Sequence, residues 1–233
     1  MTLTLFALAL APGLAIMLFI YFMDRHEKEP LRLLALSFFY GLLSVGLTLL
    51  LSGAFGKILP QYENIIVREA IRAFLGVALV EEFSKFIFLI LFLYPHKEFN
   101  EPFDGIVYAV MISMGFATLE NILYVADGGL GVALLRMFTA VPAHATFAVM
   151  MGYFAGSAKF KQRHMAYSLI GLLVATLFHG FYDFFLFISH IPFIALLTLI
   201  SLITGIVLSS RAIRRHSDAS PFRIRKWKRF RKR

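Results

Sequence analysis

The chain has 233 residues, of which 59% are hydrophobic and only 16% are charged; its mean hydropathy is +0.77 and its formal net charge is +9. A soluble domain of this length carries roughly 25% charged residues, so the composition excludes an ordinary soluble domain. Cysteine is absent, which excludes a disulfide framework, a thiolate metal site and a thiol nucleophile.

The apolar residues fall into blocks of about 20, the length at which a helix crosses the hydrocarbon core of a bilayer. Hydropathy therefore predicts an all-α integral membrane protein, a bundle of about seven transmembrane helices. In chain order the predicted helices are Leu3–Met23, Leu31–Leu51, Ala70–Tyr94, Phe103–Val125, Leu134–Ser157, Tyr167–Ser189 and Phe193–Ser210. We expect the first helix to be a retained span, because no basic residue precedes it and no convincing cleavage site follows it.

Basic residues are unevenly distributed among the segments that connect these helices. If the N-terminus lies outside, 18 of the 23 Lys and Arg residues fall on the inner side and four on the outer side. Because cytoplasmic loops are enriched in Lys and Arg, we predict an outside N-terminus, an outside segment Gly53–Glu69 and a cytoplasmic C-terminus. An odd number of spans is needed for this arrangement, which favours seven.

The chain divides into a membrane domain, residues 1–210, and a basic tail, residues 211–233. The tail contains eleven Lys and Arg residues together with Phe222, Trp227 and Phe230. A basic, aromatic tail can suggest a nucleic-acid partner. Because this one directly follows a span, we interpret it as a cytoplasmic topology anchor that contacts anionic lipid headgroups, and expect no nucleic-acid partner.

Several predicted spans contain ionisable side chains. Each such group costs about 2.5–3.5 kcal/mol on insertion scales, so it requires a reason to be there. These side chains, with one neighbouring amide, are Glu81, Glu82, Lys85, Asp104, Glu120, Asn121, His144, His179 and Asp183. Counted from the outer ends of their helices, six of them fall roughly 8–18 Å deep at 1.5 Å per residue: Glu81, Glu82, Glu120, His144, His179 and Asp183. Four helices therefore bring carboxylates and imidazoles to one layer, and we expect an active site inside the outer half of the bilayer.

Helical spacing predicts local pairs among these residues. Lys85 follows Glu81 by four positions and Glu82 by three, so it can pair with either carboxylate. His179 and Asp183 are four apart, which lets Asp183 hold one imidazole nitrogen. On the preceding span, which carries His144, Gly152 and Gly156 form a small-residue stripe on which a neighbouring helix can pack closely.

The residue types restrict the possible chemistry. Ser84 points away from the two glutamates beside it, so it lacks the base that a serine nucleophile needs. Asp104 lies at a different depth from Asp183, which excludes an aspartyl dyad; as a helix cap or first-turn acid, Asp104 has an ordinary structural explanation. What remains is a Glu/His site that activates water, with or without a metal.

Five motifs occur in the middle of the chain, each on a predicted span. They read Glu81-Glu82-Phe83-Ser84-Lys85, Phe103-Asp104-Gly105-Ile106-Val107-Tyr108, Gly115-Phe116-Ala117-Thr118-Leu119-Glu120-Asn121, His144-Ala145 and His179-Gly180-Phe181-Tyr182-Asp183. In type and order they resemble the motifs of the PrsW family of intramembrane proteases. Ala109 departs from the pattern, where glycine is expected after the tyrosine.

The resemblance implies proteolysis of membrane-anchored proteins, such as anti-sigma factors, near the extracytoplasmic side of a bacterial cell membrane. By the same resemblance Glu81 and Glu82 supply the general base, and His144 and His179 bind a metal or stabilise the oxyanion. Lys85, Glu120, Asn121, Asp183 and Asp104 support the site. A proton-coupled transporter is the alternative, because it also uses buried Glu, His and Lys residues.

Two versions of the catalytic site stay open. His144, His179 and Glu82 offer the His₂Glu ligand set of a catalytic zinc ion. Against zinc, the two histidines come from different helices, and Lys85 would oppose a cation. In the other version no cofactor is needed, because a glutamate activates water and the histidines hold the oxyanion. The sequence favours this second version.

Overall fold

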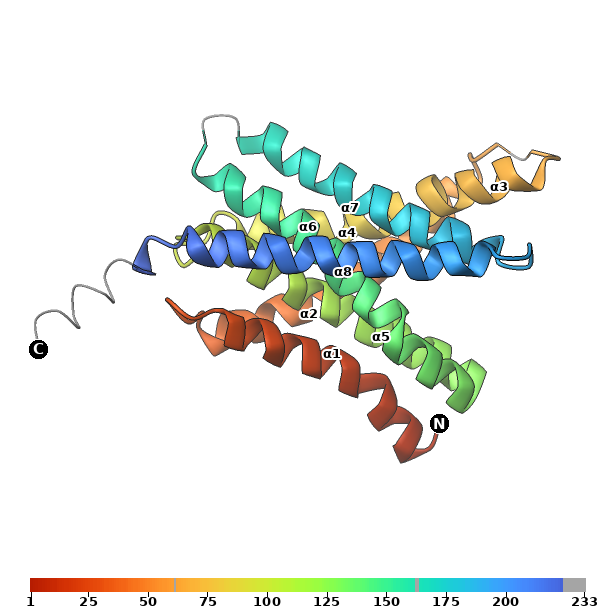
Figure 1. Cartoon of the computed structure of the whole chain (residues 1–233), viewed down its shortest axis with the longest axis horizontal. Helices are drawn as coiled ribbons and strands as arrows, with labels where there is room; N and C mark the ends of the chain where they lie inside the picture. Colours follow the sequence, from red (N-terminus) through yellow and green to blue (C-terminus); the bar gives the residue numbers. More distant parts are fainter. Residues whose placement is uncertain (61, 162–163, 224–233) are drawn as a thin grey trace, which may run out of the picture.

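The computed structural model describes residues 1–60, 62–161 and 164–223 (Figure 1). Within these residues all regular structure is helical, as the composition predicts. The helices are α1 (Leu3–Met23), α2 (Leu31–Phe55), α3 (Ile65–Ile71), α4 (Leu79–Phe88), α5 (Pro102–Phe138), α6 (Ala140–Lys159), α7 (His164–Phe187) and α8 (Ile194–Asp218), with π-helical segments η1 (Arg72–Ala78) and η2 (Leu89–Leu93).

One continuous helical stretch, residues 65–93, consists of α3, η1, α4 and η2 in succession. It begins at Asn64, whose side-chain oxygen accepts hydrogen bonds from the backbone N–H groups of Ile66 and Val67. Such a cap satisfies donors that the first helical turn leaves without partners. The predicted helix Ala70–Tyr94 is therefore present, and it starts five residues earlier than expected. Turns of π-helix are frequent near functional sites, and η1 directly precedes the helix that carries Glu81 and Glu82.

α5 is longer than predicted. It continues past Val125 to Phe138, with a break at Gly129, whose φ of 68° and ψ of −154° are not helical. Positive φ is the region that glycine occupies without a steric penalty, so the break falls where the sequence permits it. The predicted helix from Leu134 is wrong in its start, because residues up to Phe138 belong to α5 and α6 begins at Ala140.

α5 forms the centre of the bundle, and every residue from Phe103 to Thr118 is buried. α6 packs closely against its first half, because Gly152 and Gly156 of α6 face Gly105 and Pro102. A Cβ added to either α6 glycine would lie under 3.0 Å from backbone atoms of α5. The small-residue stripe predicted from the sequence is therefore a close helix–helix contact. α2 makes a similar contact on α5, with Gly41 against Gly115.

By length and composition, five helical stretches in the described part of the chain can cross a membrane. They are Leu3–Met23, Leu31–Phe55, Pro102–Lys159, His164–Phe187 and Ile194–Asp218. The third, of 58 residues, contains both α5 and α6, and the charged stretch of residues 65–93 is not among the five. These helices are consistent with a multi-pass membrane protein, while the count of seven crossings stays a prediction.

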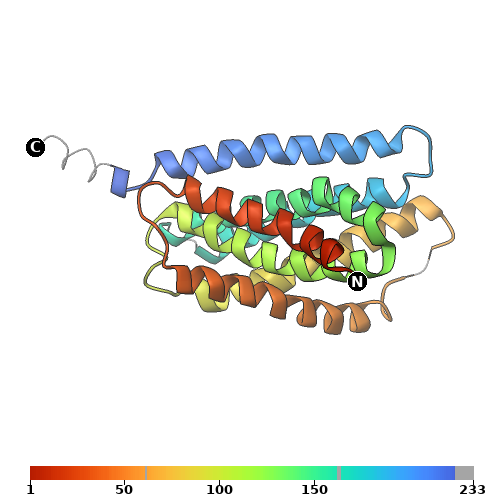
Figure 2. The ribbon, with the colours of Figure 1, turned by 90° about the horizontal axis from the view of Figure 1, so that it is seen from below.

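The connections gather at two opposite ends of the bundle. Figures 1 and 2 show the N-terminus and α3 at one end, with the C-terminal end of α8 at the other. α8 continues to Asp218, past the predicted end at Ser210, so the first part of the basic tail is helical. Of the aromatic residues expected to contact lipid, Trp227 and Phe230 lie outside the described residues.

Candidate active site

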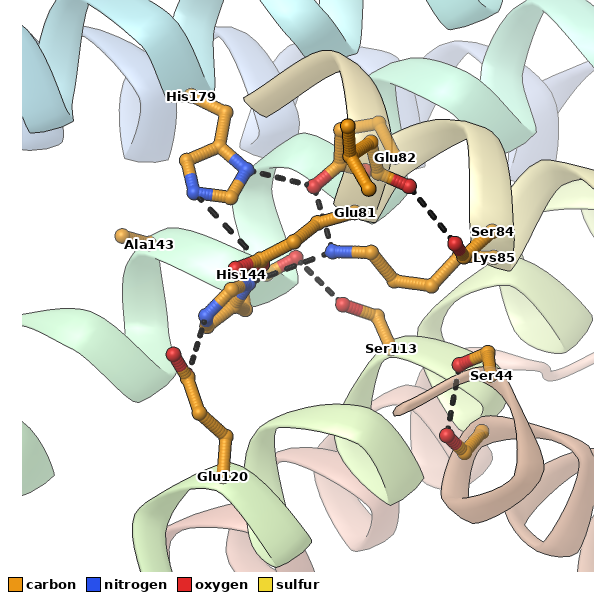
Figure 3. Close-up of polar contacts among 12 residues, drawn as sticks. Ser44, Glu81, Glu82, Ser84, Lys85, Ser113, Glu120, Ala143, His144 and His179 are labelled. Atoms are coloured by element: carbon orange, nitrogen blue, oxygen red, sulfur yellow. Dashed lines mark hydrogen bonds and ion pairs between the residues drawn. The ribbon is translucent and has the colours of Figure 1, made fainter. Parts of the chain in front are cut away.

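Four helices contribute the predicted site residues. α4 carries Glu81, Glu82 and Lys85, α5 carries Glu120 and Asn121, α6 carries His144, and α7 carries His179 and Asp183. Figure 3 shows the side chains of Glu81, Glu82, Lys85, Glu120, His144 and His179 converging between the helices. Most of these residues are under 9% exposed, and Glu82 and Asn121 are 0% exposed. The structure thus brings together the layer of ionisable groups that helix depth predicts.

Aromatic packing brings α7 against the helix that carries the glutamates. A Cβ added to Gly180 would collide with the ring of Phe74 in η1, so only glycine lets this ring approach. Phe74 then packs edge-on against Phe181, with the ring centroids 5.0 Å apart. This contact holds α7 against η1, and it places the neighbouring His179 beside the first turn of α4.

Three carboxylates surround His179. Its Nδ1 lies 2.8 Å from Glu82 Oε1, and its Nε2 lies 3.3 Å from Asp183 Oδ2. The contact with Asp183 confirms the pair predicted from the four-residue spacing. Glu81 Oε2 lies farther away, 3.9 Å from Nε2, which is beyond a hydrogen bond. The imidazole also stacks on Phe147, with the ring centroids 4.7 Å apart, so its orientation is fixed by both polar and apolar neighbours.

Lys85 pairs with Glu82 and not with Glu81, the other carboxylate that helical spacing allows. Its Nζ lies 2.5 Å from Glu82 Oε1, the same oxygen that contacts His179. The ammonium also lies 3.5 Å from His144 Nδ1 and 4.5 Å from the ring centroid of Phe116. Lys85 therefore compensates the charge of Glu82 and reaches toward His144.

His144 is held from the opposite side. Its Nε2 lies 3.0 Å from Glu120 Oε2, and its ring is nearly perpendicular to that of His179, with the centroids 5.2 Å apart. Because a carboxylate only accepts hydrogen bonds, Nε2 carries the proton in this contact and Nδ1 faces Lys85. Each histidine thus has one nitrogen bound to a glutamate, while its other nitrogen faces Lys85 in His144 and Asp183 in His179.

Glu81 differs from the other glutamates of the site. Its Oε2 is buried and has no hydrogen-bond partner in the described part of the chain. Glu82 Oε2 is also buried without a partner, but its Oε1 is committed to Lys85 and His179. Buried polar atoms without partners are uncommon, and such an atom in a site suits a group that acts on water or on a ligand.

Ligand atoms from Glu81, His144 and His179 all lie within 4.8 Å of one another, so this group can hold a metal ion. It contains Glu81 where the sequence suggested Glu82. The carboxylates that contact the other histidine nitrogens, Glu82 and Glu120, are the kind of partner that orients metal-binding histidines.

Asp104 does not join this site. It lies sixteen residues before Glu120 on the same helix, about 24 Å away at 1.5 Å per residue. Its Oδ2 accepts hydrogen bonds from the backbone N–H groups of Asn100 and Glu101, at 2.7 and 2.8 Å. This is the structural role expected of an acid in the first turn of a helix, where Asp104 and Glu101 form a capping box.

Sequence reasoning missed one residue at the edge of the site, Arg136. It contacts both Glu120 and Asn121, although it follows them by sixteen and fifteen residues. The only local signal was the Gly128-Gly129 pair between them, which predicts a break but not where the chain goes afterwards. Ser84 donates its hydroxyl to Val80 O, which agrees with its exclusion as a nucleophile.

Comparison with known proteins places these residues in a family. Residues 29–209 match the family described as PrsW family intramembrane metalloprotease. Protease PrsW of Geobacillus kaustophilus is 40% identical over 188 residues, 78% of this chain and 80% of that protein. Protease PrsW of Bacillus subtilis is 36% identical over 179 residues, 76% of this chain and 80% of that protein. Protease PrsW of Clostridioides difficile is 36% identical over 197 residues, 81% of each chain. No solved structure matches the chain.

Proposed function

The chain belongs to the PrsW family of intramembrane proteases, and from this premise we propose that it hydrolyses peptide bonds in membrane-anchored proteins with Glu81 as the general base. The observation that carries the proposal is the buried, unpartnered Oε2 of Glu81 beside two histidines. A gap of 3.9 Å between this oxygen and His179 Nε2 is too long for a direct hydrogen bond and suits a bridging water.

In the proposed reaction Glu81 accepts a proton from water while the water oxygen bonds to the carbonyl carbon of the substrate. The carbonyl oxygen becomes an oxyanion, which the Lys85 ammonium and the His179 N–H stabilise, while the unprotonated Nδ1 of His144 accepts a hydrogen bond from the attacking water. Glu81 then returns the proton to the departing amine as the C–N bond breaks. Glu82 and Asp183 hold His179, and Glu120 holds His144, so both imidazoles are oriented before the substrate arrives.

We assign the base role to Glu81 rather than Glu82 because the two carboxylates have different partners. Glu82 Oε1 accepts from Lys85 and His179, which ties this side chain into the framework of the site. Glu81 makes no such short contact and is free to move a proton. Its 8% exposure, against 0% for Glu82, also leaves it nearer to an incoming water.

The same residues fit a zinc ion, which Glu81, His144 and His179 would hold in the His₂Glu set found in catalytic zinc sites. When bound, zinc would lower the pKa of water and polarise the substrate carbonyl. We assign the activation of water to Glu81 rather than to a metal ion, because the two histidine nitrogens that would bind the metal already have other neighbours. Lys85 lies 3.5 Å from His144 Nδ1, and Asp183 lies 3.3 Å from His179 Nε2.

We further propose that the chain crosses the bilayer seven times, with residues 65–93 as the third crossing and α5 and α6 as separate ones. Supporting this, the connections alternate between the two ends of the bundle (Figure 2). With the N-terminus outside, the site lies in the outer half of the bilayer and cleavage occurs near the extracytoplasmic side. Single-span proteins such as anti-sigma factors are substrates of this kind. On the cytoplasmic side, the basic tail contacts anionic lipids.

Purified protein and a single-span substrate in lipid vesicles test the proposal. We expect the unaltered chain to cut the substrate and Glu81→Gln to lose this activity, because an amide cannot accept the proton from water. Glu69→Gln is the matched control: Glu69 lies three turns earlier in the same helical stretch, paired with Arg68 and Arg72 away from the site. Normal cleavage by Glu81→Gln refutes the assigned base, and proton-coupled solute uptake without cleavage supports the transporter alternative.

A further inference from the structure

The break at Gly129 carries a cationic side chain back to the site. In a straight helix, Arg136 and Glu120 would lie about 24 Å apart at 1.5 Å per residue. Instead, Arg136 Nη2 lies 2.6 Å from Glu120 Oε2, because the chain changes direction at Gly129 before Arg136 is reached. The helical residues between Gly129 and Phe138 therefore serve to return one arginine to the first part of α5.

The guanidinium of Arg136 is fixed from several directions. Its Nε donates to Asn121 Oδ1 at 2.9 Å, and its Cζ lies 4.1 Å from the ring centroid of Tyr124. Asn121 in turn donates to the backbone carbonyl of Ala9 in α1, also at 2.9 Å. The Arg136 side chain is only 13% exposed, so these contacts lie largely out of contact with solvent.

Arg136 and His144 share one carboxylate oxygen. Glu120 Oε2 accepts from Arg136 at 2.6 Å and lies 3.0 Å from His144 Nε2. An arginine in two hydrogen bonds of fixed direction constrains its partner more strongly than a flexible lysine can. The carboxylate is therefore locked with Oε2 toward His144, which requires the Nε2–H tautomer and leaves Nδ1 turned toward the site.

We propose that Arg136 is a positioning residue of the protease: it holds Glu120 against His144 and so fixes the tautomer and the direction of that histidine. The proposal rests on the catalytic role of His144 proposed above. The surroundings of Arg136 support a dedicated role, since neighbouring side chains on its segment are mostly exposed and apolar: Leu130, Leu134, Leu135 and Phe138. Arg136 is the charged residue of this segment, and its guanidinium contacts Glu120 and Asn121 at the edge of the site.

Steady-state cleavage of a single-span substrate by the full chain in lipid vesicles tests the proposal. Arg136→Gln should lower kcat by about 10–100-fold, the usual cost of losing a group that orients an active-site histidine, while KM stays close to that of the unaltered chain. Arg136→Lys should recover part of kcat. Lysine keeps the positive charge and can still donate to Glu120, but it lacks the planar guanidinium that donates to Glu120 and Asn121 at once. Arg72→Gln is the matched control, an arginine at the same end that pairs with Glu69.

A double-variant cycle distinguishes a role of Arg136 in positioning Glu120 from a role in only holding residues 130–138 against the bundle. If Arg136 acts through Glu120, then Arg136→Gln should cost little further kcat in a Glu120→Gln background. An equal loss in both backgrounds overturns the proposal, as does an unchanged kcat or a change confined to KM. Should Arg136→Gln fail to accumulate in the membrane, Arg136→Lys is measured in both backgrounds with the same criteria.

Failure of this proposal is distinguishable from failure of the proposed function. If the unaltered chain cuts the substrate, Glu81→Gln does not, and Arg136→Gln retains full kcat, only the role of Arg136 is refuted. If Glu81→Gln cuts normally, the assigned base is refuted whatever Arg136 does.

Discussion

Adjacent residues in this site have different environments. Glu81 and Glu82 are neighbours in the chain, yet their side chains leave α4 about 100° apart, as the helical repeat of 3.6 residues requires. One carboxylate is consequently tied to Lys85 and His179, and the other keeps a buried oxygen without a hydrogen-bond partner among the described residues. A fixed carboxylate that orients donors and a free one that moves protons are complementary roles in one general-base site.

The metal dependence of cleavage is also decided by individual residues of the site. We expect the purified chain to keep its activity after treatment with a chelator, because the Lys85 ammonium, 3.5 Å from His144 Nδ1, opposes a cation at the nitrogen that would bind it. Metal analysis before and after chelation, paired with cleavage rates, is the measurement. Stoichiometric zinc whose removal abolishes cleavage and whose return restores it would contradict this expectation.

Some contacts of the site follow from helical spacing alone, and others do not. The pair His179–Asp183 is predictable because both residues are four apart on one helix. The choice of Glu82 by Lys85 is not, because the spacing allows Glu81 equally, and the outcome depends on His179 from another helix contacting the same oxygen. Arg136 is beyond local reasoning altogether, since its approach to Glu120 depends on the path of the chain after Gly129.

At the scale of helices, hydropathy located the elements well and their ends less well. It predicted α1 to the residue, because Thr2 caps its start and a polar segment follows Met23. It ended the central helix at Val125, whereas α5 continues through the glycine pair to Phe138. Polar and glycine residues reduce hydropathy without stopping a helix, so the composition of residues 126–133 indicated a loop where the structure has a single break, at Gly129.

The contact between α5 and α6 allows a test of helix packing. Gly152→Ala should destabilise the protein by about 1–3 kcal/mol, the usual cost of overpacking, because the new Cβ would meet the backbone of α5 at Gly105. Thermal unfolding in detergent measures this effect. Gly46→Ala in α2 is the control, since nothing lies within 4 Å of a Cβ there. Equal stability of Gly152→Ala and the unaltered protein would show that the helices separate at little cost.

Two connecting segments at the end of the bundle opposite the N-terminus bring carboxyl groups together. Burial raises the pKa of Asp24 to about 6 and the pKa values of Glu29 and Glu101 to about 7. Glu29 accepts a hydrogen bond from Tyr108, and the charges of Asp24 and Glu27 raise its pKa further. These groups bind protons more tightly in the folded chain than their ordinary values of 3.8 and 4.5 allow in the unfolded chain.

Stability should therefore depend on pH in one direction. The contribution of these buried carboxyl groups to the free energy of unfolding is fully present below their ordinary pKa values and is lost as pH rises through about 7. The protein should therefore unfold at a lower temperature at pH 8 than at pH 5.5. Glu29→Gln should reduce this difference, whereas Glu63→Gln, an exposed glutamate at the opposite end, should leave it unchanged. Greater stability at pH 8 would mean that the buried carboxyls are charged in the folded protein.

For the molecule as a whole, the distribution of charge predicts its direction in the membrane, while the fold determines which segments share a side. The N-terminus and α3 lie at one end of the bundle, and the C-terminal end of α8 lies at the other. Arg211, Arg214 and Arg215 lie in the last turns of α8, at the second end. Because cytoplasmic segments are enriched in Lys and Arg, the second end should face the cytoplasm and the active site should open toward the outside.

Cysteine labelling of intact cells decides this orientation directly, because the chain has no native cysteine. Lys57→Cys and Asp218→Cys place single thiols at exposed positions on opposite ends of the bundle. We expect a membrane-impermeant maleimide to label Lys57→Cys in intact cells and Asp218→Cys only after the membrane is opened. The reverse pattern would place the basic tail outside. It would then put Glu81, His144 and His179 in the cytoplasmic half of the bilayer, so that cleavage would occur on the opposite side from the one proposed.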